Sequence, residues 1–423
     1  MNKPKVLLIG PVCNISGYSE HARTLLDALI KVEENIDLYL QNTQWAAATI
    51  EFEYIDKYSR LLEKTHHLMH QRADDQGNVN LSGFFDISFQ VRPPNEFQQI
   101  SEFDVGVTAA LETTSAPAEW VPQCNMMSHI LVVSEHAKKN LKNTKDQNGV
   151  TITTPVTVIP FGYNPDIELT DFYKDLDVTT KFNFLSVLQM APRKNFDVMM
   201  KWFLDEYADN EDVGIFIKTH TQNSSTLDFH QTQNRLNLLL NSIQPQRKCK
   251  VYLVHGNFSE EQMLSLYNPE YIDCYLTLTH GEGFGIPIFN AACAEIPIIA
   301  TNWSGHLDYL RAPVFNKSGK PKLKSHFIKV AYDIEEVMEQ HLMPGLITKE
   351  CKWAYPKEDS FKKALRFIHN HKSEVLTDCK NLSKHLKDNY SLDDIHKRYT
   401  NFLDEVLSGI TTKVTNDKST FFL

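Results

Sequence analysis

The segment from His280 to Pro287 carries the residues whose types and spacing best fit a chemical role. Glycines at 281, 283 and 285 let the backbone approach a ligand closely, and Pro287 suits the first turn of a following helix. A glycine loop that opens a helix presents free N–H groups and the positive end of the helix dipole, which favours a diphosphate. Glu282, the acid in this loop, is therefore expected to contact neutral groups beside that anion, such as sugar hydroxyls.

Two adjacent cations stand in a second loop. Arg193 and Lys194 follow a predicted strand at 182–188. Arginine binds phosphate as a fork and lysine as a point charge, so the pair can neutralise a diphosphate. Without a wider context, a solvated surface lysine explains Lys194 equally well. A third loop, at 10–18, follows the first predicted strand but lacks the G-x-G-x-x-G spacing of dinucleotide-binding folds.

Alternating strand and helix patterns place these loops at strand ends. The alternation predicts parallel sheets with crossover helices, and it runs twice, on either side of a predicted linker at 160–181. Strands are predicted at 6–9, 36–40, 86–91, 105–110, 130–133, 156–159, 182–188, 213–218, 251–254, 274–278 and 296–300. Helices are predicted at 19–32, 134–141, 196–207, 227–243, 259–267 and 286–294, and then at 335–341, 359–370, 373–389 and 392–407.

Composition narrows the class of protein. A chain of 423 residues suits two domains, and its net charge of −10 argues against a general polyanion binder. The seven cysteines are scattered, without C-x-x-C or zinc-like spacing, which is typical of reduced thiols. No apolar run reaches membrane-spanning or signal-peptide length, so we expect a cytoplasmic protein. The D-x-D at 175–177 falls in the predicted linker and is interpreted as a surface turn rather than a metal site.

Taken in order, the loop residues resemble a known family. Pro-Arg-Lys-Asn at 192–195 and Glu-Gly-Phe-Gly-Ile-Pro at 282–287 are similar to the signatures of family-4 retaining glycosyltransferases of GT-B fold. Weaker matches cover most of the chain, at 17–18, 111–120, 132–136, 158–162 and 301–306. The compact chain also resembles glycosyltransferases that bacteriophages carry, which would place it in the host cytoplasm.

The resemblance implies an α/β GT-B fold, in which two Rossmann-like domains face each other across a cleft. The acceptor-side domain would span residues 1–165 and be completed by a C-terminal helix at about 392–423, which crosses back to it. The nucleotide-sugar-binding domain would span residues 176–390.

The resemblance also implies roles for single residues. Lys194 would stabilise the departing diphosphate, Glu282 would touch the transferred sugar as the first acid of the family's E-x7-E motif, and Glu112 stands where the family often has a catalytic His. The second acid of that motif is replaced by Asn290, and the family's Arg before the Lys is replaced by Gln189. The implied donor contacts are Gly17, Tyr18, Arg193, Lys194, Gly283, Phe284, Gly285, Ile286 and Asn290.

The predicted function is therefore that of a metal-independent, retaining glycosyltransferase without a cofactor. It would move a sugar from a nucleotide-diphosphate sugar, a UDP-sugar by preference, to a hydroxyl of a glycan or a similar acceptor. An alternative is a phage enzyme that glycosylates hydroxylated or hydroxymethylated cytosine in DNA. A GT-B epimerase or phosphorylase, and a non-catalytic sugar-nucleotide binding protein, are alternatives of another class.

Plainer interpretations stand beside several of these residues. Glu112 is explained equally well as a helix-capping acid near Thr113 and Thr114. The histidines at 255, 280 and 306 are expected to be hydrogen-bonded loop residues. A basic run is interpreted first as a solvated loop, and second as a contact for a phosphorylated acceptor or nucleic acid; it contains Arg311, Lys317, Lys320, Lys322, Lys324 and Lys329.

Overall fold

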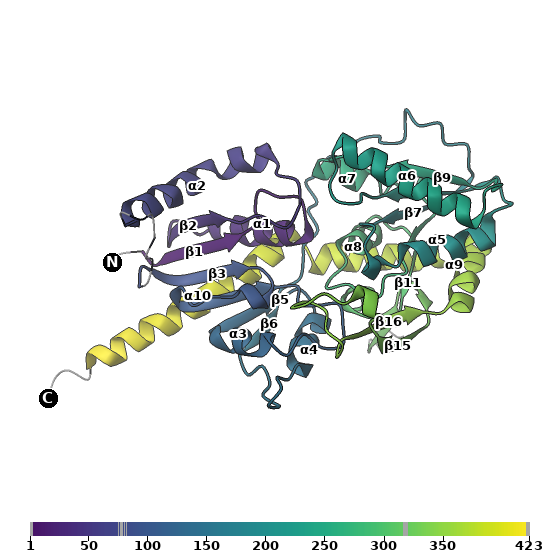
Figure 1. Cartoon of the computed structure of the whole chain (residues 1–423). Coiled ribbons are helices and arrows are strands. Elements are labelled where there is room, and N and C mark those ends of the chain that lie inside the picture. Colours follow the sequence, from purple (N-terminus) through teal and green to yellow (C-terminus); the bar gives the residue numbers. More distant parts are fainter. Residues whose placement is uncertain are drawn as a thin grey trace.

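Two parallel sheets, each covered by helices, make up most of the chain (Figure 1). The computed structural model describes residues 3–74, 76, 79, 81, 83–315 and 320–419, with residues 315 and 410–419 described by backbone alone. The predicted α/β fold with two Rossmann-like domains is confirmed.

The first sheet contains six parallel strands in the order β2-β1-β3-β4-β5-β6. Its strands are β1 (Lys5–Gly10), β2 (Asp37–Asn42), β3 (Phe85–Val91), β4 (Ser101–Thr108), β5 (His129–Val132) and β6 (Val156–Val158), which agree with the predicted apolar runs. Its helices are α1 (Gly17–Ile30), α2 (Phe52–Arg72), α3 (Trp120–Met126) and α4 (Glu135–Asn143). The sequence analysis missed α2, although Tyr58, Leu61, Thr65 and Leu68 recur along its buried face at helical spacing.

The second sheet has the order β14-β11-β10-β7-β8-β9 and is also parallel. Its strands are β7 (Phe182–Val187), β8 (Val213–Lys218), β9 (Lys250–Val254), β10 (Cys274–Leu276), β11 (Ile298–Thr301) and β14 (Ile328–Val330). Its helices α5 (Phe196–Tyr207), α6 (Thr226–Ile243), α7 (Glu260–Ser265) and α8 (Ile286–Cys293) were all predicted. Every residue of β8 is buried, as expected for a parallel sheet with helices on both faces.

The segment after β11 differs from its prediction. Residues 335–341 do not form a helix: β15 (Tyr332–Glu336) pairs antiparallel with β16 (Lys352–Pro356), and only a 3-10 turn follows at Glu339–His341. The basic run is not a loop in its described part, because β12 (Arg311–Phe315) and β13 (Pro321–Ser325) pair antiparallel and Lys329 lies in β14. Lys324 pairs with Asp378 at 2.7 Å, and Lys317 lies outside the described residues.

Two long helices end the chain. The helix α9 (Glu358–Asn389) merges two predicted helices across a kink at His371, which has a non-helical φ of −132°. The helix α10 (Leu392–Ser419) returns to the first sheet, where its buried side chains join the core formed by α1, β1 and β3 (Figure 1). In the part of the chain that is described, no helix combines the length and the apolar character needed to cross a bilayer.

Candidate active site

The topology of the second sheet marks where a ligand is expected to bind. Strand order reverses between β7 and β10, and open α/β sheets bind ligands at the carboxyl ends of such strands. The loop after β7 holds Arg193 and Lys194, and the loop after β10 holds Glu282. These three predicted residues therefore share one edge of the sheet.

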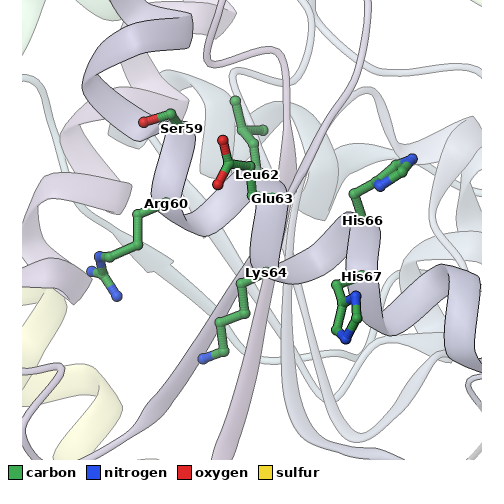
Figure 2. A pocket seen from close by; sticks show the side chains of 7 residues that line it. All are labelled: Ser59, Arg60, Leu62, Glu63, Lys64, His66 and His67. Carbon is green, nitrogen blue, oxygen red and sulfur yellow. The ribbon is translucent and has the colours of Figure 1, made fainter.

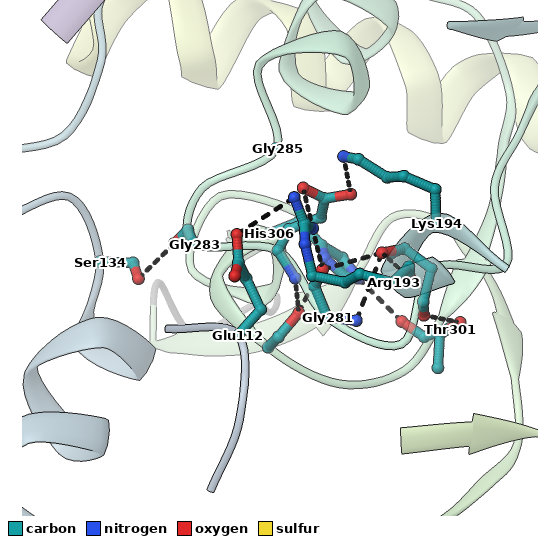
Figure 3. Close-up of polar contacts among 12 residues, drawn as sticks. Glu112, Ser134, Arg193, Lys194, Gly281, Gly283, Gly285, Thr301 and His306 are labelled. Atoms are coloured by element: carbon teal, nitrogen blue, oxygen red, sulfur yellow. Dashed lines mark hydrogen bonds and ion pairs between the residues drawn. The ribbon is translucent and has the colours of Figure 1, made fainter. Parts of the chain in front are cut away.

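Glu282 is the centre of a buried network of charges, which also contains the side chains of Arg193, Lys194 and Glu112 that are labelled in Figure 3. Its carboxylate accepts a hydrogen bond from Lys194 Nζ at 2.6 Å and another from Arg193 Nη1 at 3.1 Å. Arg193 also reaches the first domain, where its Nη2 lies 3.2 Å from Glu112 Oε1. The side chains of Glu282 and Lys194 are only 8% and 15% exposed. Three loops thus bring two acids and two bases into one desolvated cluster.

The pKa values in this cluster reflect a balance of burial and pairing. Burial alone would raise the pKa of Glu282, but Lys194 and Arg193 hold it down at about 2. Burial lowers the pKa of Lys194, and the neighbouring Glu282 opposes that shift. Burial would also lower the pKa of Arg193, but Glu112 and Glu282 raise it above its usual range. At neutral pH Glu282 is therefore an ionised carboxylate that both cations contact.

Backbone geometry fixes the directions of these side chains. Asn195 has a left-handed φ of 52° between the 3-10 turn Pro192–Lys194 and α5, and its amide donates to Leu278 O at 3.2 Å. In the other loop, Glu282 N donates to Ser304 Oγ at 2.8 Å, while Gly305 N donates to Glu282 O at 2.9 Å. The main chain of Glu282 is thus held on both sides.

The glycine loop lets two domains approach each other closely. A Cβ atom on Gly281 would lie 2.6 Å from Glu112 O, and one on Gly283 would lie 3.1 Å from Ala109 O. Because these two glycines have no side chains, the backbone of the first domain can pack against the loop. The sequence analysis had explained both glycines by the approach of a ligand alone. Gly285 has a φ of 89°, which favours glycine, and it turns the chain into α8.

The start of α8 offers unpaired donors. Among the described residues, the N–H groups of Gly283, Phe284 and Gly285 donate to no protein acceptor. They precede the N-terminus of an eight-residue helix, whose dipole adds positive potential. With Lys194 beside them, these donors match the chemistry of a diphosphate.

The first domain contacts the loop between β10 and α8 directly. Ser134, the N-cap of α4, donates from Oγ to Gly283 O at 2.6 Å, and Glu135 N donates to Asp308 Oδ2 at 2.7 Å. Burial raises the pKa of Asp308 to about 6. The strand-end loops of both sheets therefore meet at the charge cluster.

Several solved structures have the same fold as this chain. Sucrose-phosphate synthase from Thermosynechococcus elongatus has a TM-score of 0.61 at 11% identity, over 96% of this chain and 100% of that one. Anabaena HepE in complex with UDP-glucose has a TM-score of 0.60 at 11% identity, over 95% and 99% of the two chains. Trehalose-6-phosphate synthase OtsA has a TM-score of 0.57 at 11% identity, over 96% and 99%. This chain has the GT-B fold.

Sequence comparison with known families and proteins does not identify the GT-B fold. No family model matches the chain, and no curated protein matches it significantly. The GT-B likeness therefore rests on the arrangement of the elements, at an identity of 11%.

Within the GT-B fold, the remaining predicted residues occupy both domains. Glu112 lies in the loop after β4 and far from the first residue of α3 or α4, so the helix-capping interpretation is wrong. Gly17 begins α1 and is exposed, while the hydroxyl of Tyr18 lies 2.8 Å from Thr108 Oγ1. Ile286 and Asn290 lie on α8 and are partly buried, and the ring of Phe284 is buried in the core.

The three loop histidines are hydrogen-bonded, as expected. His280 and His306 each contact a backbone carbonyl, and His255 lies 2.9 Å from Asp228. In the described part of the chain, no group of three or more His, Cys, Asp or Glu side chains is placed to hold a metal ion. Asp175 and Asp177 are exposed in the linker.

An open hollow on α2 lies apart from this GT-B site (Figure 2). Its lining comes from one helix and consists of Ser59, Arg60, Leu62, Glu63, Lys64, His66 and His67. Arg60 pairs with Glu33, and Lys64 pairs with Asp37. Because its two cations are paired with acids of its own domain, the hollow adds nothing to the chemistry of the GT-B site.

Sequence reasoning missed several residues that shape the site. Asp308 carries no local signal, because its partner Glu135 is 173 positions away. Ser134 and Ser304 occurred only inside matched segments, although a Ser between a strand and a helix is a typical N-cap.

Proposed function

We propose that this chain is a retaining glycosyltransferase that moves a sugar from a UDP-sugar to a hydroxyl acceptor without a metal ion. The single observation that carries the proposal is the buried cluster of Glu282, Lys194 and Arg193, next to three unpaired N–H groups at the start of α8. Sugar hydroxyls match the carboxylate, and a diphosphate matches the cations and the amides. The neighbour HepE, solved with UDP-glucose, supports the same ligand class.

The proposed chemistry needs stabilisation of departing negative charge more than covalent help. Lys194 and the amides of Gly283, Phe284 and Gly285 would stabilise the nucleoside diphosphate as the glycosyl–phosphate bond breaks. Glu282 would accept hydrogen bonds from the hydroxyls of the transferred sugar and hold that sugar in position. The acceptor hydroxyl would attack the anomeric carbon of the sugar from the face that the diphosphate leaves. A diphosphate oxygen would take the proton of that hydroxyl. Glu112 would orient Arg193 from the acceptor side.

The first test measures nucleotide release from UDP-, GDP- and ADP-sugars. Each donor is incubated alone, with simple glycans, and with duplex DNA that contains hydroxymethylated cytosine, and Glu282→Ala is compared with the unaltered protein. We expect release that depends on a UDP-sugar and a glycan and falls at least 100-fold in the variant. The anomeric configuration of the product, measured by NMR, tests retention.

Other outcomes would redirect the assignment. Release that requires the modified DNA would favour the DNA glycosyltransferase, and donor interconversion without an acceptor would favour an epimerase. Tight UDP binding by calorimetry without turnover of any donor would favour a non-catalytic binding protein. The neutral Asn290, which replaces the second acid of the family's motif, is the reason to test this alternative.

A further inference from the structure

A buried asparagine organises the loop that follows β2. Asn14 is fully buried, and its amide nitrogen donates to Gln44 Oε1 at 3.1 Å and to Ala48 O at 3.3 Å. Its amide oxygen accepts a hydrogen bond from Trp45 N at 3.2 Å. Ala46, at the tip of this loop, has a left-handed φ of 42°, which costs energy for a residue other than glycine. The loop is therefore held in one strained conformation by a residue from the neighbouring strand end.

This loop presents an aromatic pair. Trp45 stacks on Tyr18 with ring centroids 4.1 Å apart and an angle of 17° between the planes, and both residues are partly buried. The hydroxyl of Tyr18 is fixed between Thr108 Oγ1 at 2.8 Å and Ala109 N at 3.3 Å. These hydrogen bonds hold the ring of Tyr18 in place. Because Trp45 stacks on that ring, the plane of its indole is fixed as well.

The pair lies where the first sheet is expected to bind a ligand. Strand order in that sheet reverses between β1 and β3, and Tyr18 follows β1. The Tyr18 hydroxyl lies 3.3 Å from Ala109 N, three positions before Glu112. Glu112 in turn contacts Arg193 of the charge cluster at 3.2 Å. A ligand on the aromatic pair would therefore be next to the proposed transfer site.

We propose that Trp45 and Tyr18 form the platform on which the ring of a carbohydrate acceptor stacks, with Glu112 accepting hydrogen bonds from its hydroxyls. This inference rests on the proposed glycosyltransferase function and names its acceptor class. A rigid aromatic face covers the apolar C–H face of a sugar ring, and carboxylates satisfy the hydroxyls at its edge. A nucleobase on DNA fits less well, because Glu112 and a net charge of −10 would repel its phosphates.

Indole N–H signals of the 15N-labelled full-length protein test the platform directly. Methyl glycosides of glucose, galactose and mannose, and separately 5-hydroxymethyl-2′-deoxycytidine, are titrated with and without UDP. The Trp45 signal is assigned from its loss in Trp45→Phe. We expect a saturable shift of that signal with at least one glycoside and none with the nucleoside. A shift with the nucleoside alone, or no shift with any probe, would overturn the proposal.

Turnover of a UDP-sugar with the glycoside that binds gives a second readout. In Trp45→Ala we expect the glycoside KM to rise at least tenfold while kcat changes less than threefold, and Trp45→Phe should recover most of the loss. Trp202→Phe, on α5 and with its ring tilted against Phe361, is the matched control and should change neither constant. An unchanged KM in Trp45→Ala would overturn the proposal.

Different results would contradict the acceptor platform and the transferase function. The shift of the Trp45 signal by a glycoside needs no donor, so it stands even if no UDP-sugar is turned over. Conversely, UDP-sugar turnover without any glycoside effect on Trp45 would leave the transferase intact and remove the platform.

Discussion

The charge cluster couples residues that no single stretch of sequence connects. The sequence analysis could find Arg193, Lys194 and Glu282 because each lies in a loop with a recognisable pattern. It could not find that Glu112 and Glu282 share Arg193, because that arrangement depends on the approach of two domains. With two acids and two bases, the cluster is neutral overall, which offsets much of the cost of burying it. Removing Glu282 leaves Lys194 without its ion-pair partner, and removing Arg193 leaves Glu112 without its own.

The pH dependence of stability should reveal this coupling through Glu282→Gln. The pKa of Glu282 is held at about 2, below its ordinary value of 4.5, so its ionisation stabilises the folded state above pH 4.5 and loses this effect as the pH falls toward 2. The unaltered protein should exceed the variant in free energy of unfolding by on the order of 3 kcal/mol at pH 7. That difference should shrink between about pH 5 and pH 3.

Urea unfolding followed by fluorescence at a series of pH values measures this difference. Glu63→Gln, at an exposed position of α2, is the control and should show no such trend. A difference between Glu282→Gln and the unaltered protein that stays constant down to pH 3 would mean that Glu282 is not held by these cations.

Elements with strong local patterns were predictable, and elements that depend on distant partners were not. Helix α5 was predicted at its observed bounds, and the gap between the predicted helices at 359–370 and 373–389 coincides with the kink at His371. The helix predicted at 335–341 was wrong because β15 forms only through pairing with β16, which lies some twenty positions further along the chain. Tertiary pairing overrode a locally helix-like run of acids and apolar residues.

The loop between β10 and α8 gives a prediction at this scale through Gly283→Ala. The added Cβ would lie 3.1 Å from Ala109 O and 3.2 Å from Ala109 Cβ, so it would push the loop away from the first domain. We expect UDP release to fall at least tenfold and stability to fall by about 1–3 kcal/mol. Turnover assays and thermal unfolding measure both effects.

Gly409→Ala on α10 is the matched control. A Cβ there would meet nothing within 4 Å, and alanine favours a helix over glycine, so this variant should be slightly more stable and equally active. If Gly283→Ala behaved like Gly409→Ala, the close approach of the two loops would not matter for activity.

At the scale of the whole molecule, the last described helix returns to the first domain. After α9 has packed against the second sheet, α10 returns and contributes to the core of the first, and Tyr399 on α10 hydrogen-bonds to His21 on α1 at 3.0 Å. The two domains are thus tied by the linker and by the passage from α9 to α10. This double connection restricts their relative positions, which the contacts between Ser134 and Gly283 and between Arg193 and Glu112 require.

Truncation of α10 tests this account of the molecule. A chain that stops after Ser391 loses five buried apolar side chains of the first core, Ile395, Tyr399, Phe402, Leu403 and Val406. At about 1.5–3 kcal/mol for each, the loss approaches the whole stability of a typical domain. We therefore expect the first domain to unfold and thermal melting to lose the cooperative transition of that domain. A chain that stops after Ser408 keeps these side chains and should melt like the full-length protein. Equal melting of the two truncated chains would show that α10 is dispensable for the first domain.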